Sequence, residues 1–157
     1  MTLASNFYTC LTQTNSLVTN LGLTWPPTSG VVPVVTRKLP KAEEVLDAPL
    51  PILAIAPGPK PERVGYPCGT YVEVDYPVQI VLISAGNANY TSNLDIPPSW
   101  RQAIRRVFQA PRVLVGVIPG QFDTTLNLDA LLDRSELNSL YDYTAMEVRF
   151  SVLEPQT

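Results

Sequence analysis

The two carboxylates of Glu73 and Asp75 have the spacing best suited to chemistry in this sequence. They stand two positions apart in an apolar stretch typical of a strand, so both side chains leave the strand on the same face. Carboxylates at this spacing could share a divalent cation or a proton, which would make a metal-assisted or acid–base site. The alternative is a solvated strand face, and we favour it because charged residues are mostly exposed.

The other reactive residue types narrow the possible chemistry. The sequence has no histidine, which excludes Ser–His and Cys–His nucleophiles and zinc sites built on imidazole. Cys10 and Cys68 lie far apart without metal-ligand spacing; we expect two reduced, partly buried thiols, although a disulfide between them stays open. Asp123, Asp129 and Asp133 lack the spacing of a calcium loop. We therefore predict no cofactor, no metal site and no catalytic residue.

Three arginines form the densest basic cluster. Arg101, Arg105 and Arg106 fall on one predicted helix and allow three interpretations: a nucleic-acid contact, a solvated helix face, or a surface for salt bridges between subunits. We predict a subunit interface, with Glu73 and Asp75 as the matching acidic residues.

Size and composition indicate one soluble-type domain. The chain has 157 residues, 45% hydrophobic and 16% charged, with a net charge of -3. That charge excludes binding of nucleic acid by bulk electrostatics. We expect neither a signal peptide nor a membrane span, because no stretch approaches the roughly 20 apolar residues that a spanning helix needs. The 16 prolines gather between apolar runs, and residues 25–49 are predicted to be irregular.

The helices and strands that carry these residues are predicted from hydrophobic periodicity. It predicts one helix over 4–21, ended by Gly22, and a second over 100–108, capped by Ser99. Residues 58–69 read as a loop, and 127–140 as a short helix or a loop. The predicted strands cover 31–35, 49–57, 71–84, 112–118 and 141–154.

This element order favours an α+β fold, with a mainly antiparallel sheet of about four strands packed by one or two helices. In the long strand we expect the first half to be half-exposed and the second half buried on both faces, with Pro77 at an edge or a bulge. The predicted core consists of Ile52, Leu53, Ile55, Val78, Ile80, Leu82, Ile104, Val107, Phe108, Val113, Val115, Val148 and Phe150.

The final strand alternates strictly between apolar and polar residues. Its apolar set is Met146, Val148, Phe150 and Val152, and its polar set is Glu147, Arg149 and Ser151. Period-two alternation puts the apolar set on the core face and the polar set on an exposed face.

Four stretches together resemble a known family. The order PLPILAIAPGP, YPVQIVLISAGN, WRQAIRRVF and YDYTAMEVRFSVLE, over about residues 50 to 154, is similar to the tail terminator proteins of tailed bacteriophages, including related tail-completion and head–tail joining proteins. The resemblance implies a structural virion protein, assembled in the host cytoplasm, and not an enzyme. It implies a homo-oligomeric ring, a hexamer, that ends the tail tube and joins it to the head connector. The implied partners are the tail tube protein, the connector or adaptor proteins, and DNA only in passage, without a membrane.

In such a ring the face that bears Glu147 and Arg149, together with Glu73 and Asp75, would turn toward the lumen or the adjoining subunit; in the lumen, carboxylates would repel DNA phosphates. Arg149 would then need a nearby acid, so we predict a carboxylate within ion-pair reach of it. The alternatives are another phage tail or connector subunit, an enzyme that uses Glu73 and Asp75, and a monomeric module that binds a peptide at a sheet edge.

Overall fold

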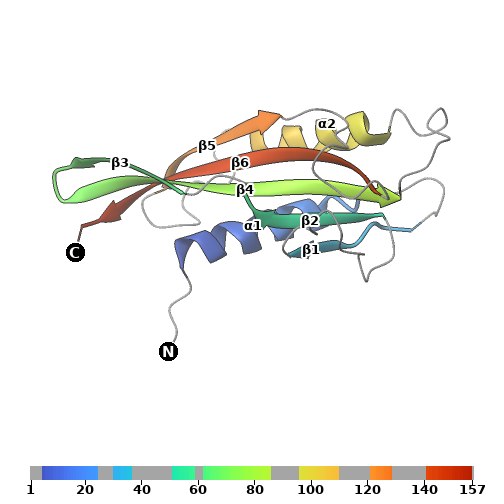
Figure 1. Ribbon diagram of the computed structural model, residues 1–157, viewed down its shortest axis with the longest axis horizontal. Coiled ribbons are helices and arrows are strands. Elements are labelled where there is room, and N and C mark those ends of the chain that lie inside the picture. Colours follow the sequence, from blue (N-terminus) through green and yellow to red (C-terminus); the bar gives the residue numbers. More distant parts are fainter. Residues whose placement is uncertain are drawn as a thin grey trace.

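A mixed sheet of six strands organises the protein (Figure 1). The structure is a computed structural model and describes residues 5–24, 30–36, 51–58, 62–85, 96–109, 121–128 and 141–156. Five strands lie side by side in the order β1-β2-β4-β6-β5. β3 pairs with residues 71–75 of β4, the part of that strand that β2 does not reach. All pairs are antiparallel except β1 with β2. The strands are β1 (Val34–Thr36), β2 (Ile52–Pro57), β3 (Arg63–Cys68), β4 (Tyr71–Ala85), β5 (Gln121–Leu128) and β6 (Tyr141–Pro155).

The α+β class is therefore confirmed, as is the mainly antiparallel pairing, whereas the sheet has six strands where about four were predicted. Two helices, α1 (Asn6–Asn20) and α2 (Ile96–Gln109), lie behind the sheet in the view of Figure 1. Both pack on the face that carries Leu53, Ile80 and Phe150, so this helix-covered face holds the main hydrophobic core.

The first helix is defined by its two ends. The Ser5 hydroxyl accepts a hydrogen bond from the Tyr8 N–H at 3.1 Å and so caps a donor that the helix itself leaves unpaired. Gly22 follows the helix with φ of 57°, a left-handed conformation that favours glycine, which confirms the predicted end. Along this helix Tyr8 is 54% exposed, whereas Cys10 and Thr14 are buried. Thr14 is satisfied there because its hydroxyl donates to the Cys10 carbonyl.

The second helix begins earlier than predicted. We expected Ser99 to cap it, but α2 starts at Ile96 and includes Pro97 and Pro98 in its first turn. Proline is tolerated at that position because first-turn N–H groups have no partner within the helix. The indole N–H of Trp100 donates to the Thr24 carbonyl at 3.2 Å and ties α2 to the segment after α1.

The long strand β4 is confirmed almost to the residue, and it lies inside the sheet. Its first half includes the exposed Tyr71 and Glu73, and residues 77–83 are buried on both faces, as expected. Pro77 lies neither at an outer edge nor at a bulge of this strand. It lies where the neighbour of β4 changes from β3 to β2, and its carbonyl accepts from the Gly58 N–H. The missing N–H of proline thus falls at a junction where no ladder bond is required.

Two strands were missed in the sequence. β3 lies in a stretch that was predicted to be a loop because it contains Gly65 and Pro67. The strand tolerates both residues, since it pairs with β4 alone among the described residues and has a shift in register. Gly69, with φ of 66°, makes the two-residue turn that joins β3 to β4. The other missed strand is β5, which pairs with β6. Its sequence, QFDTTLNL, is too polar to be recognised as a strand from its hydrophobic pattern.

The predicted core is otherwise confirmed for the described residues. Val107 is only partly buried, and Val113 and Val115 lie outside the described residues. The strand predicted over 112–118 lies outside them too, as does 129–140 of the segment predicted as a helix or loop.

Candidate interaction surfaces

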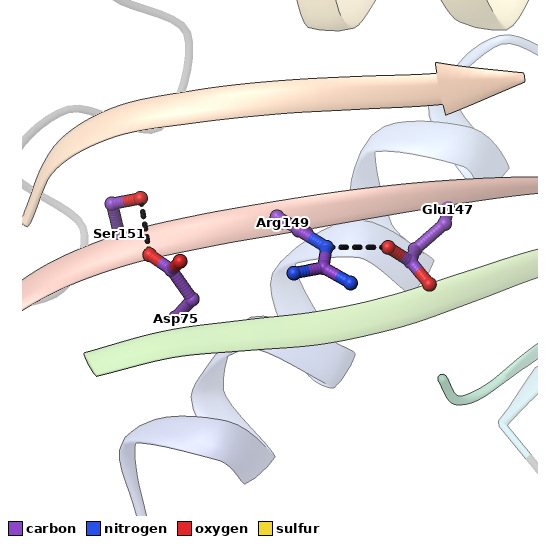
Figure 2. Close-up of polar contacts among 4 residues, drawn as sticks. All are labelled: Asp75, Glu147, Arg149 and Ser151. Carbon is purple, nitrogen blue, oxygen red and sulfur yellow. Dashed lines mark hydrogen bonds and ion pairs between the residues drawn. The ribbon is translucent and has the colours of Figure 1, made fainter. Parts of the chain in front are cut away.

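A row of polar side chains runs along the sheet face that neither helix covers, which we call the open face (Figure 2). On β6, the Arg149 Nε donates to the Glu147 Oε1 at 2.5 Å. One register step along, the Ser151 hydroxyl donates to Asp75 Oδ1 on β4 at 2.6 Å. The predicted carboxylate within ion-pair reach of Arg149 is therefore confirmed, and it belongs to the same chain.

The polar row is less exposed than its alternation predicted. Glu147 and Ser151 are 7% and 8% exposed, and the neighbouring Gln79 is 7% exposed. The prediction that Glu147 and Ser151 lie on an exposed face was wrong, since period two assigns a face but not its degree of exposure. Hydrogen bonds make this burial tolerable, because a buried polar group without a partner is costly.

The arginines of α2 have three different environments. Arg101 is 7% exposed, and its Nη1 donates to the Thr144 hydroxyl at 2.7 Å and to the Ala145 carbonyl at 3.2 Å, both on β6. Its guanidinium is thus engaged inside the subunit, which leaves Arg105 and Arg106 for the predicted interface. Arg105 is half-buried, and its Nε is a buried donor without a hydrogen-bond partner in the part of the chain that the structure describes. Arg106 is exposed.

The predicted acidic partners lie on the open face. Glu73 is exposed and stands opposite Leu153, whereas Asp75 is half-buried and bonded to Ser151. β3, the start of β4 and the end of β6 extend past both helices at the left of Figure 1; we call this extension the arm. Tyr71 and Leu153 on the arm are 48% and 36% exposed.

A second polar cluster joins α1 to the sheet on its other face. Glu154 Oε1 accepts hydrogen bonds from the Tyr76 hydroxyl and from Asn6 Nδ2, the latter at 2.6 Å. The Tyr76 ring also packs against Phe7, with centroids 6.0 Å apart. Burial, followed by the bond to Glu154, raises the pKa of Tyr76 well above its ordinary value.

Cys10 lies one helical turn after Asn6 and is a free, buried thiol. Burial raises its pKa to about 12. Cys10 is a free thiol as predicted, but it is fully and not partly buried, and the side chain of Cys68 lies outside the described residues.

These groups define what the surfaces can do. No set of three or more metal-ligating side chains comes together among the residues that the structure describes, so a cation shared by Glu73 and Asp75 would have only those two carboxylates there. In the same part of the chain, no helix is long and apolar enough to cross a membrane.

Sequence reasoning missed the exposed apolar residues of the arm and the Tyr76–Glu154 bond. Tyr71 and Leu153 break the polar pattern of the open face, and this is the signal that could have revealed them. Glu154 carried no such signal, because its partners Asn6 and Tyr76 are 148 and 78 residues away.

Comparison of the sequence with models of known protein families gave no match, and comparison with curated proteins gave none either.

Proposed function

We propose that this protein is a structural subunit of the neck of a tailed bacteriophage, and that it assembles into a ring that ends the tail tube and joins it to the head connector. The observation that carries the proposal is the arm. A three-stranded extension beyond the helices leaves Val64, Tyr71 and Leu153 at 63%, 48% and 36% exposure. Val64 lies on the helix-covered side and Tyr71 and Leu153 on the open face, so both faces of the arm carry exposed apolar groups. Exposed apolar groups on a projecting element are typical of surfaces that contact another protein.

The more exposed part of the open face, which carries Glu73 and the partly exposed Arg149, fits the channel of such a ring. Because Glu147 neutralises Arg149, that arginine would not hold the phosphates of passing DNA. The net charge of -3 acts in the same direction. The ring would be homo-oligomeric and hexameric, with the tail tube protein and the connector proteins as its neighbours.

Sedimentation velocity and negative-stain microscopy of the purified full-length protein test the proposal. We expect a concentration-dependent assembly and rings of uniform diameter with a central opening. A protein that stays monomeric at about 100 μM would contradict it, since contacts that build a stable assembly hold well below that concentration. A monomer would favour the binding module, for which β5, an edge strand of the sheet among the described residues, offers a place for an added strand.

A further inference from the structure

Two surfaces of opposite charge lie far apart on this subunit. α2 packs on the helix-covered face through Ile104 and Phe108. Glu73 belongs to the open face, because it stands opposite Leu153 in the register of β4 and β6. In Figure 1 the arm and α2 also lie toward opposite ends of the long axis. The arginines of α2 therefore cannot meet Glu73 within one subunit.

The patch around Glu73 has the composition of a guanidinium receptor. Glu73 is exposed, and it makes no hydrogen bond or ion pair within the residues described. Tyr71 precedes it by two positions on the same face, and Leu153 is its cross-strand partner. A carboxylate beside an exposed aromatic ring suits arginine, because the guanidinium can bond the carboxylate bidentately and stack on the ring. We call this the Tyr71–Glu73–Leu153 patch.

The end of α2 offers the matching group. The Nε of Arg105 is buried and has no hydrogen-bond partner in the described residues. A donor that has lost water without gaining an acceptor is destabilising. Because the rest of the Arg105 side chain is partly exposed, a carboxylate on another chain that draws the guanidinium outward would remove this cost. Arg106, next along the helix, is exposed and adds a second positive charge.

We propose that the Tyr71–Glu73–Leu153 patch of one copy binds Arg105 and Arg106 on α2 of a second copy. The inference rests on the proposed function and names the contact that would build its ring. Because the two surfaces are different, each copy uses its patch on one neighbour and its helix on the other. Such head-to-tail contacts generate closed rings when the rotation between copies closes.

Charge reversal in the full-length protein tests the contact. We expect Glu73→Arg and Arg106→Glu each to weaken assembly at least tenfold in sedimentation velocity, because like charges then face each other. Both positions are exposed, so each variant should stay folded by circular dichroism. An equal mixture of the two variants should recover assembly to within about threefold of wild type, because alternating copies restore an opposite-charge pair at every contact.

Asp123→Arg is the matched control for Glu73→Arg. Asp123 is exposed on β5, so the substitution changes net charge as Glu73→Arg does but leaves both the arm and α2 unchanged. We expect wild-type assembly from it. The inference is overturned if Asp123→Arg weakens assembly as much as Glu73→Arg, or if the mixture stays dissociated. An assembly indifferent to Glu73→Arg and Arg106→Glu would overturn the contact and leave the proposed function standing, whereas a monomeric wild type would overturn both.

Discussion

Arg149 and Glu147 form an ion pair on one strand, with Nε and Oε1 2.5 Å apart, on the sheet face that neither helix covers (Figure 2). Residues two apart on a strand share a face, so the pair closes without any contribution from a loop. The side chains are 21% and 9% exposed, which places the pair in a partly dry setting where a lost partner is costly.

Removing one member of this pair should therefore destabilise the fold. We expect Glu147→Ala to lower the free energy of unfolding by about 1–3 kcal/mol, because it leaves the Arg149 guanidinium poorly solvated and without this bond. The double variant with Arg149→Ala should lose less than the sum of the two single losses. Urea denaturation of all four proteins measures the difference, and additive losses would show that the pair contributes nothing.

The core face of β6 predicts a much larger effect. Phe150 is 1% exposed, so Phe150→Ala should cost about 3–5 kcal/mol of unfolding free energy. Leu153→Ala is the control on the same strand: it is 36% exposed on the open face and should cost less than about 1 kcal/mol. Equal losses from the two variants would mean that the face assignment of β6 is inverted.

Alkaline pH should destabilise the protein through Cys10. Its pKa is about 12 in the folded chain and 9.0 when unperturbed, so the unfolded chain releases this proton first. The contribution is fully present below about pH 9 and is lost as pH rises toward 12, with a slope of at most roughly 1.4 kcal/mol per pH unit. The raised pKa of Tyr76 acts in the same direction.

Denaturation of wild type and Cys10→Ala between pH 7 and pH 11 isolates this contribution. The substitution itself should shift stability equally at every pH, whereas the decline above pH 9 should be shallower in the variant. Parallel curves would show that Cys10 does not titrate differently in the folded chain.

The same burial predicts low thiol reactivity. In a Cys68→Ser variant, which leaves Cys10 as the remaining cysteine, we expect an aromatic disulfide reagent to react at least 100-fold more slowly with the native protein than with the urea-unfolded protein. Rapid labelling under native conditions would mean that α1 opens readily from the sheet.

The sequence by itself determined the elements whose pattern is local. The 3.6 period and Gly22 placed α1, and strict alternation placed β4 and β6 and identified their core faces. The acid beside Arg149 was predicted too, but from the expectation of a channel that must not hold DNA and not from burial of the face. These properties depend on neighbours within a few positions, which a sequence records directly.

The tertiary structure alone decided what depends on distant pairing. β3 forms despite Gly65 and Pro67 because β4 supplies its partner strand, and the polar β5 forms because β6 does. Arg101 has a different environment from Arg105 and Arg106 because β6 lies beside it and accepts hydrogen bonds from its guanidinium. Glu73 and Leu153 become neighbours across 80 residues of sequence for the same reason. Backbone groups of one strand are satisfied only by another strand, and the chain that supplies it can lie anywhere in the sequence.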